Sequence, residues 1–459
     1  MFNSKKNPII YGTLLLSCSG LFCRGLGFFY HLFISRTFGE EAMGIFQLTS
    51  PILMLAFSLT GAGIQTAISK YTASMLAKSK HQTAHLYLLY GCLISLTLSS
   101  LYSLIIYCFS DPIAVHILGE KKCAVLLRIC AFSFPLSSLH CCFNGYFYGQ
   151  KNTKLPSLTQ IAEQFIRIGS VLIIYAFYHA KNLVPSIAIT CFGMLSGEAA
   201  ALLLSSIYYL YSCKKTSQPL RLSSLRKNSK TFFMQWEIPK QLLSYSLPLT
   251  LNRVLVNLLQ SYEAISLPAA LKNYGYSTKA ALSIYGVLTG MALSFVMFPS
   301  TFTYSVSVLL LPTVSEADAE TNAKSGNIKL KRIIRRTVMF SFSLGFLCTL
   351  FFYFTGNYCG QFLFQSTLAG RFIKILSFLC PFLYLKLTLC SVLNGLKKTR
   401  ETLWINLFSI SLRLVAILWI VPHIGIYGYL YGLLLSDFLA TLWCFYFLKK
   451  SIQLRSQRF

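Results

Sequence analysis

Apolar segments long enough to cross a lipid bilayer recur along the chain, and they limit what it can fold into. The first is LLSCSGLFCRGLGFFYHLFISRTFG, from Leu15 to Gly39. About 20 apolar residues span the hydrocarbon core as an α-helix. Only 12% of the 459 residues are charged, well below the quarter typical of soluble domains, and the alternation of a membrane β-strand is absent. The sequence therefore predicts an all-α polytopic membrane protein.

Charged or turn-rich breaks divide the apolar sequence into twelve predicted spans. The first is too long for the apolar core of a signal peptide and lacks a small-residue cleavage site, so we expect it to be retained. The eighth is too long for one straight crossing, and Pro299 is expected to kink it. The predicted spans are 9–34, 43–67, 85–109, 123–147, 155–178, 184–212, 241–270, 280–314, 333–354, 372–394, 402–421 and 424–448.

The net charge of +28 follows the predicted loops. Of the 41 Lys and Arg residues, 27 lie in the termini and in alternate loops on one side of the membrane, 7 in the opposite loops and 7 within spans. Basic residues are enriched in cytoplasmic loops, so we expect both termini to be cytoplasmic. The charge is then explained by topology and by contact with anionic membrane lipids, and no nucleic-acid partner is needed.

Cysteines and catalytic motifs give no indication of an enzyme. The fifteen cysteines are scattered, mostly inside apolar spans, and no CxxC pair occurs. Buried cysteine behaves as a small hydrophobe, so we expect no disulfide framework, no metal site and no cofactor. No phosphate-binding P-loop, GxSxG elbow or HExxH motif is present, which leaves ATP hydrolysis and covalent catalysis without support.

The two halves of the chain match at an offset of 246 residues. "GQKNT" at 149–153 corresponds to "GLKKT" at 395–399, and Arg167 corresponds to Arg413 and His140 to Lys386. The sequence thus predicts an N-terminal six-helix lobe (1–212), a basic cytoplasmic linker (213–240) and a C-terminal six-helix lobe (241–459). Six spans per half make the repeats parallel, as in transporters whose halves move around a central cavity.

Ionisable residues inside spans are costly and usually mark a transport pathway. Arginine suits phosphate oxygens because its planar fork is permanently charged, and a cavity with excess cations would attract an anionic headgroup. A carrier of cationic drugs would be expected to show the reverse bias. The candidate substrate-binding cations are Arg24, Arg253, Arg167, Arg413 and Lys386, with His140 as a sixth; the candidate charge partners or coupling residues are the acids Glu163, Glu198, Glu263 and Asp437.

Several of these residues also have a structural interpretation. Glu163 and Arg167 are spaced i,i+4 and can pair on one helix. Glu198 and Asp437, in the last helix of each half, can clamp Arg167 and Arg413, and His140 can be a hydrogen-bonded packing residue. In contrast, Arg24 and Arg253 have no acid within helical reach on their own helices, which favours a cavity role.

Longer motifs resemble a known family. CRGLGFFYHLFISRTFGEEAMGIFQL, followed by GAGIQTAISKYTA, and in the second half IYGVLTGMALSFVMFPS and LLLPTVSEA, resemble the stage V sporulation protein B-like branch of the multidrug/oligosaccharidyl-lipid/polysaccharide (MOP) flippase superfamily. The resemblance spans nearly the whole chain. It implies a two-lobed, MATE-like fold with alternating access, and export of lipid-linked glycan precursors at the cytoplasmic membrane.

The resemblance also carries expectations for individual residues. Related lipid II flippases use arginines in a cationic cavity for the diphosphate, and Arg24 matches the first-helix arginine of that pattern. Arg253 lies in the corresponding seventh helix, and His31 stands where relatives often carry another basic residue. Many relatives have a further C-terminal helix pair that lines a groove for the lipid tail, whereas this chain ends soon after its twelfth span.

Three functions follow as alternatives. The first is a non-enzymatic flippase for an isoprenoid-diphosphate-linked oligosaccharide or peptidoglycan precursor, serving spore-cortex or envelope polysaccharide synthesis, with an ion as a further partner for coupling. The second is a cation-coupled multidrug exporter of the same fold. The third is a membrane scaffold without transport, which should tolerate the loss of Arg24.

Overall fold

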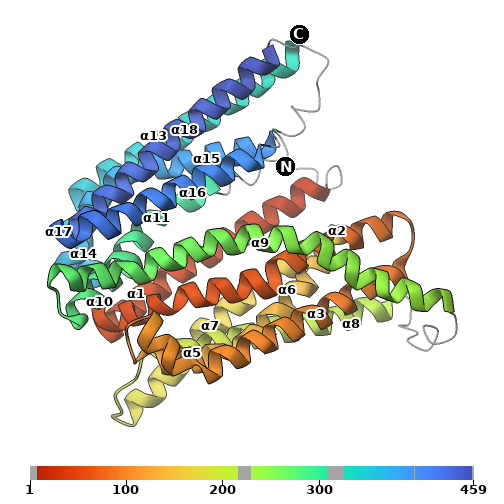
Figure 1. Ribbon diagram of the computed structural model, residues 1–459, viewed down its shortest axis with the longest axis horizontal. Helices are drawn as coiled ribbons and strands as arrows, with labels where there is room; N and C mark the ends of the chain where they lie inside the picture. The colour runs from red at the N-terminus through yellow and green to blue at the C-terminus, as the bar shows by residue number, and fades with distance from the viewer. Residues whose placement is uncertain are drawn as a thin grey trace. The chain divides into compact units, whose positions relative to one another are not determined.

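The computed structural model describes residues 8–215, 229–304, 306–307, 314, 324–396 and 398–456. All regular secondary structure within these ranges is helical (Figure 1). Short π-helical segments, η1 (Ser58–Ala62), η2 (Ile113–Ile117), η4 (Val287–Leu293) and η6 (Ala416–Ile420), and the 3₁₀ segment η5 (Ser377–Leu379) adjoin the α-helices. The α-helices are α1 (Pro8–Phe57), α2 (Gly63–Ala77), α3 (His81–Cys108), α4 (Ser110–Pro112), α5 (Cys123–Ala131), α6 (Ser133–Gly149), α7 (Lys154–Ala180), α8 (Ile189–Lys215), α9 (Ser229–Tyr274), α10 (Thr278–Gly286), α11 (Ser294–Met297), α13 (Lys324–Phe364), α14 (Thr367–Leu376), α15 (Cys380–Gly395), α16 (Thr399–Val415), α17 (Val421–Ile424) and α18 (Ile426–Ser456).

The helices confirm the predicted all-α, multi-pass membrane class. Ten helices in the described part of the chain are long and apolar enough to cross a membrane, and the bent pair α5–α6 (43°) raises the number to eleven. The first two predicted spans, 9–34 and 43–67, correspond to the single run Leu14–Ala77, which turns at Gly39 (φ 80°, ψ −178°). A positive φ is readily adopted by glycine because it has no Cβ. Counting this run as two crossings gives the twelve predicted spans.

The helix is interrupted at Pro299, where a kink was predicted. Helix α11 ends at Met297, Phe298 and Pro299 form a turn, and helix resumes at Ser300. Proline removes one backbone donor and its ring clashes with the preceding turn, so the eighth span is divided at this point.

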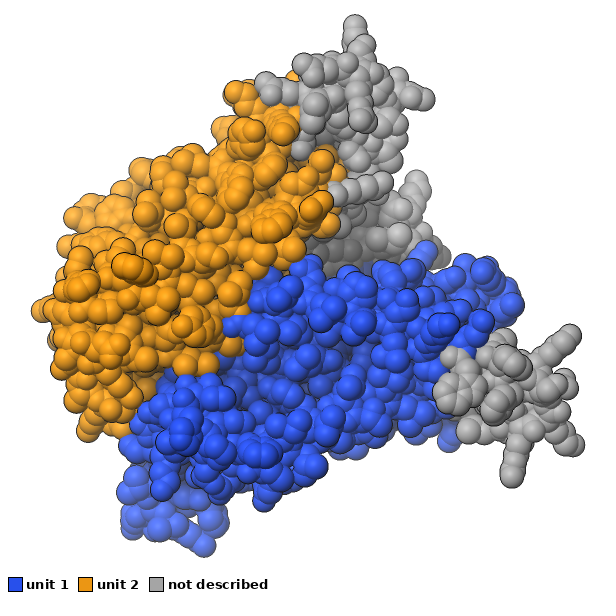
Figure 2. All heavy atoms as spheres, in the orientation of Figure 1, with its two compact units in different colours: residues 1–23, 48–258 blue, residues 24–47, 259–459 orange. Residues whose placement is uncertain are grey.

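The chain forms two compact units, drawn in blue and orange in Figure 2. Unit 1 comprises Met1–Cys23 and Leu48–Leu258, and unit 2 comprises Arg24–Gln47 and Leu259–Phe459. These units differ from the predicted lobes in assigning 24–47 to the second unit and 241–258 to the first, since α1 and α9 each contribute residues to both. Residues 216–228 of the predicted linker lie outside the described residues, and α9 begins at Ser229.

The core of unit 1 is centred on α6, which contacts α2, α3 and α8. Its largest fully buried side chains include Phe147, Ile68 and Leu155. A Cβ on Gly145 would lie 2.5 Å from the carbonyl oxygen of Gln65, so the absence of a side chain allows α6 to approach α2 closely. Small residues at crossings are typical of membrane helix packing.

Unit 2 contains a matching arrangement. Helix α15 contacts α13 and α18, and α18 also contacts α16, around a core that includes Leu389, Val392 and Leu393. In unit 1 the corresponding helices α6, α8 and α7 make the same contacts, α6 with α8 and α8 with α7. The repeat seen in the sequence therefore reappears as the same order of helix contacts within each unit.

Candidate functional site

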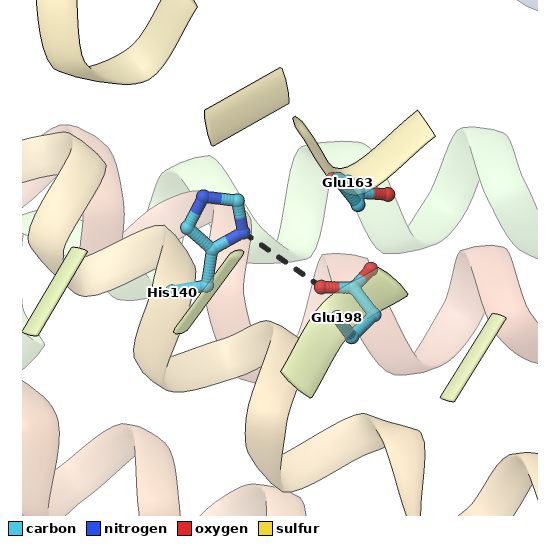
Figure 3. Close-up of side chains that lie close together, drawn as sticks. All are labelled: His140, Glu163 and Glu198. Carbon is cyan, nitrogen blue, oxygen red and sulfur yellow. Dashed lines mark ion pairs between the residues drawn. The ribbon is translucent and has the colours of Figure 1, made fainter. Parts of the chain in front are cut away.

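Three ionisable side chains of unit 1 converge from α6, α7 and α8 (Figure 3). His140 Nδ1 lies 3.7 Å from Glu198 Oε2, and Glu163 lies beside them. One ligand atom from each residue lies within 4.8 Å of the other two. The side chains of His140 and Glu198 are 8% and 10% exposed, so the cluster is nearly closed to solvent.

Neighbouring polar groups orient the imidazole. His140 Nε2 lies 3.0 Å from Asn144 Nδ2 and 3.3 Å from Thr159 Oγ1. Thr159 Oγ1 also donates to the Leu155 carbonyl, at 3.1 Å. The packing interpretation of His140 is thus compatible with its contacts, but one edge of the ring still faces Glu198.

Close packing of α7 against α8 brings Glu163 near Glu198. A Cβ added to Gly197 would lie 2.9 Å from the Glu163 carbonyl oxygen and 3.2 Å from the Arg167 Cβ. A Cβ added to Gly193 would likewise lie 2.8 Å from the Arg167 carbonyl oxygen. Two glycines one turn apart therefore allow the two helices to touch where the acids lie.

We expect Gly197→Ala to destabilise unit 1, because the added methyl group must move α7 away from α8. Overpacking of this kind typically costs about 1–3 kcal/mol. The thermal unfolding midpoint of the detergent-purified protein measures it. Gly169→Ala on α7 is the matched control, since a Cβ there meets nothing within 4 Å; it should be neutral or stabilising because alanine favours helix. Equal midpoints for the two variants would contradict the close contact.

Arg167, beside this cluster, forms the ion pair with Glu163 that the i,i+4 spacing predicted. Arg167 Nη2 donates to Glu163 Oε1 on the preceding turn of α7. Within the described residues, Arg167 Nε and Glu198 Oε2 are buried without a hydrogen-bond partner. Glu198 therefore does not clamp Arg167, as one structural interpretation proposed; its ionic neighbour is His140.

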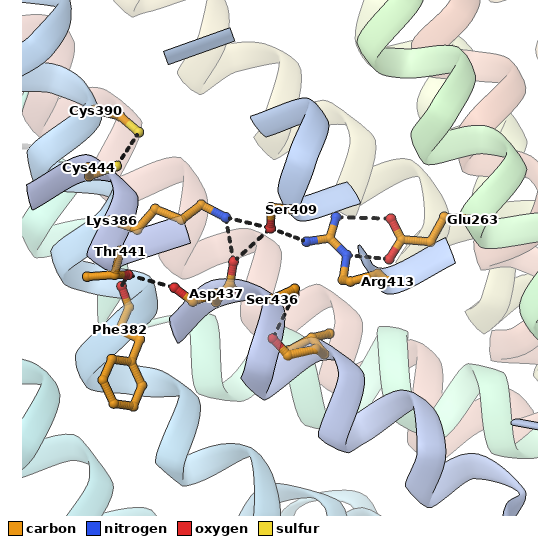
Figure 4. Close-up of polar contacts among 11 residues, drawn as sticks. Glu263, Phe382, Lys386, Cys390, Ser409, Arg413, Ser436, Asp437, Thr441 and Cys444 are labelled. Atoms are coloured by element: carbon orange, nitrogen blue, oxygen red, sulfur yellow. Dashed lines mark hydrogen bonds and ion pairs between the residues drawn. The ribbon is translucent and has the colours of Figure 1, made fainter. Parts of the chain in front are cut away.

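Unit 2 holds a longer polar network at the equivalent helices (Figure 4). Lys386 Nζ donates to Asp437 Oδ1 and lies 3.4 Å from Ser409 Oγ. Ser409 Oγ also lies 3.4 Å from Asp437 Oδ1 and accepts from Arg413 Nη1 at 3.2 Å. Asp437 thus pairs with Lys386, whereas the clamp interpretation had assigned it to Arg413.

The acid that pairs with Arg413 comes from α9. Arg413 Nε and Nη2 donate to Glu263 Oε1 and Oε2 at 2.6 and 3.0 Å, a bidentate geometry. Tyr429 OH donates to the same carboxylate at 2.9 Å. Sequence reasoning missed Ser409 and Tyr429. Ser409 had a signal, because it stands 246 residues after Glu163, whereas Tyr429 had none.

The two arginines without helical acid partners have a different environment. Arg24, in unit 2, is exposed, and its guanidinium lies 4.2 Å from the ring centre of Tyr304. Arg253, in unit 1, is exposed and forms no hydrogen bond or ion pair with any described residue. A guanidinium held on an aromatic face keeps its edge donors available, so Arg24 can bind an anion while it is held.

Unit 1 also contains a cavity of about 250 Å³. Glu198 lines it together with Thr60, Ser138 and Asn257, and apolar side chains form most of the remaining wall. Because Glu198 belongs to both, the cavity adjoins the His140 cluster. It is large enough for several water molecules.

Comparisons with known proteins agree with this architecture. The model of a family described as polysaccharide biosynthesis proteins matches residues 9–318. Stage V sporulation protein B of Bacillus subtilis (strain 168) is 28% identical over 444 residues, which cover 95% of this chain and 83% of that protein. The lipid II flippase MurJ of the same organism is 21% identical over 353 residues, covering 73% of this chain and 62% of that protein.

A solved structure matches the fold over nearly the whole chain. It is described as the inward-facing conformation of a multidrug resistance MATE family transporter of the MOP superfamily. The TM-score is 0.73 at 14% sequence identity, and the match covers 95% of this chain and 96% of the other. At this identity the likeness concerns the fold, which agrees with the resemblance found in the sequence motifs.

Proposed function

The chain belongs to the polysaccharide biosynthesis protein family, and we propose that it exports an isoprenoid-diphosphate-linked saccharide. Its relatives are flippases and transporters of the MOP superfamily. The saccharide is a peptidoglycan precursor or oligosaccharide for spore-cortex or envelope polysaccharide synthesis. Transport proceeds by alternating access across the cytoplasmic membrane. The names of the relatives, a sporulation protein and a lipid II flippase, support this substrate class.

The observation that carries the proposal is which of the intramembrane cations have an acidic partner and which do not. Arg167, Lys386 and Arg413 are each matched by an acid within their own unit. Arg24 and Arg253 remain exposed and without an acid among the described residues. An arginine at mid-bilayer costs about 2.5–3.5 kcal/mol on insertion scales. An anionic cargo accounts for the retention of each arginine, because a guanidinium fork matches the oxygens of a diphosphate.

A cation-coupled multidrug exporter is the second candidate, and the solved MATE structure favours it because the fold is shared. A carrier of cationic drugs needs exposed acids or aromatic surfaces free of cations. Here the acids Glu163, Glu263 and Asp437 are engaged by cations of their own unit. The exposed excess charge is positive, which favours an anionic cargo.

The direct test is flipping by the purified protein in proteoliposomes. Lipid II and a second isoprenoid-diphosphate-linked glycan serve as cargo, and the corresponding isoprenoid monophosphate carrier serves as the control without a saccharide. We expect flipping of at least one glycan lipid and none of the monophosphate carrier. Extrusion of a cationic dye without glycan-lipid flipping would instead identify the multidrug exporter.

We expect both termini and the segment 213–240 to be cytoplasmic, since 27 of the basic residues lie on that side and 7 on the other. A single cysteine at Ser217, in a background without native cysteines, should resist membrane-impermeant maleimide in intact cells and react after permeabilisation. A cysteine at Asn182, in the loop between α7 and α8, should show the opposite behaviour. Labelling of Ser217→Cys from outside would overturn this topology.

A further inference from the structure

Helices α13 and α18 of unit 2 lie side by side (Figure 1) and border an apolar groove of about 270 Å³. The groove reaches α15, where Leu385 is buried, and its walls are exposed side chains such as Phe342 and Phe438. Among the described residues that line it there is no ionisable group. The lining hydroxyl, that of Thr441, already donates to backbone carbonyl groups. The groove therefore offers contacts to a hydrocarbon chain and none to a polar ligand.

The wall that α13 contributes to this groove ends in two cations. Val338 and Phe342 line the groove, and Arg335 and Lys331 precede them at intervals of three and four residues. Residues at this spacing lie on one face of a helix, so this face of α13 changes from apolar to basic within two turns. Arg335 and Lys331 are exposed, and neither forms an ion pair with another described residue.

The wall that α18 contributes ends in the same way. Leu442 and Phe445 line the groove, and the exposed Lys449 follows Phe445 after four residues on the same face. Ile334, near the start of α13, and Leu448, near the end of α18, belong to one buried cluster. The two basic ends therefore lie at the same end of the groove, and this end is on the side predicted to be cytoplasmic.

We propose that this groove is a binding site for one anionic glycerophospholipid, whose acyl chain lies along the groove and whose phosphate is held by Lys331, Arg335 and Lys449. Lipid tails are as apolar as the groove, so apolar contact alone does not select one lipid over another. Charge supplies the selection, because basic groups between helices at the cytoplasmic face bind anionic headgroups. Arg24 and Arg253, the cations proposed for the cargo, do not line the groove, so this inference does not rest on the saccharide substrate.

Native mass spectrometry of the full-length purified protein tests the site. The delipidated protein in detergent is titrated with phosphatidylglycerol and, separately, with phosphatidylcholine that carries the same acyl chains. The two lipids differ in headgroup charge, so they match the groove equally and the cations unequally. We expect one phosphatidylglycerol molecule to be retained with an apparent affinity roughly tenfold or more above that of phosphatidylcholine. Equal retention of the two lipids would refute the site.

Substitution of single cations gives a sharper test. Arg335→Gln and Lys449→Gln should each weaken phosphatidylglycerol retention roughly fivefold, the worth of one cation near an anionic headgroup, and leave phosphatidylcholine retention unchanged. Arg336→Gln is the matched control, because Arg336 is also exposed but lies about 100° around the helix from Arg335. An equal loss in all three variants would show a diffuse attraction to the basic surface, and it would overturn the assignment.

A substitution within the groove tests the position of the acyl chain. Leu442 lines the groove and is 49% exposed, so the larger side chain of Leu442→Trp should occupy the groove and lower retention of both lipids. Leu347→Trp is the matched control, because Leu347 of α13 is 62% exposed and does not line the groove. Wild-type retention by Leu442→Trp would contradict an acyl chain at this position.

Two other occupants of the groove are distinguished by the same spectra. Tighter retention of an isoprenoid diphosphate than of phosphatidylglycerol would mean that the groove binds the cargo. Lipid-free dimers that dissociate in Leu442→Trp would mean that a second copy of the chain covers it. Either result would overturn the phospholipid site. Because none of these measurements uses flipping, a negative flipping result leaves their outcomes unaffected.

Discussion

Arg24→Ala is expected to abolish flipping of the isoprenoid-diphosphate-linked saccharide while folding and membrane insertion remain largely intact. The side chain is exposed, and its recorded contact among the described residues is the face of Tyr304. Its removal therefore leaves no buried partner uncompensated. Arg24→Lys should restore part of the activity, because a point charge keeps the attraction to a diphosphate and loses the bidentate fork. The measurement is flipping per correctly inserted molecule in proteoliposomes.

Lys374→Ala is the matched control for this prediction. Lys374 is another cation of unit 2 within a predicted span, and its Nζ lies 4.8 Å from the ring centre of Tyr353. It stands nearer a span end, where lysine reaches the interface, so its loss should leave flipping close to wild type. Wild-type flipping by Arg24→Ala would remove the main support for a diphosphate site at this residue.

The membrane class and the spans could be predicted because they depend on local sequence. Apolar length alone determines which segments can cross a bilayer, and the position of Pro299 inside an over-long span predicts an interruption there. The direct succession of the first two spans, with a turn at Gly39 and no longer loop between them, was harder to predict. Gly39 and Pro51 occur near their junction, but only the three-dimensional structure shows that helix continues on both sides of the turn.

Whether an ion pair could be predicted from the sequence depends on how far apart its two residues lie in the chain. Glu163 and Arg167 lie one helical turn apart, so the i,i+4 rule predicts their pairing without knowledge of the fold. Lys386 and Asp437 lie 51 residues apart, and Arg413 and Glu263 lie 150 apart. Which acid meets which cation across such distances depends on the rotation of each helix about its axis, and hydropathy in an all-apolar span gives little information about that rotation.

The internal repeat could have predicted more of the polar network than the individual residues did. The offset of 246 residues relates His140 to Lys386, and the structure places His140 beside Glu198 of α8 and Lys386 beside Asp437 of α18. Those two acids are not separated by 246 residues, since an offset of 246 from Glu198 reaches Cys444. The gapless match therefore stops before the last helix, and the equivalence of the acids appears only in the contacts.

Arg413→Met is expected to be the most destabilising of the substitutions considered. It would leave Glu263, which is 7% exposed, as a buried carboxylate whose one remaining hydrogen bond among the described residues comes from the Tyr429 hydroxyl at 2.9 Å. Breaking a buried ion pair by removing one partner typically costs about 3–5 kcal/mol, because the remaining charge is uncompensated. The unfolding midpoint of the purified protein, or its resistance to denaturant in detergent, measures this loss.

The double variant Glu263→Gln with Arg413→Met separates the lost pair from the stranded charge. A neutral glutamine can still accept the Tyr429 hydrogen bond, and replacing both ions of a buried pair is often nearly neutral. We therefore expect the double variant to recover most of the stability lost in Arg413→Met, a strong departure from additivity. Arg167→Met at the repeat position should cost less, since Arg167 and Glu163 are more exposed than Arg413 and Glu263. Additive losses in the double variant would mean that the Arg413 side chain stabilises unit 2 by packing, and that the charge of Glu263 is compensated by another group.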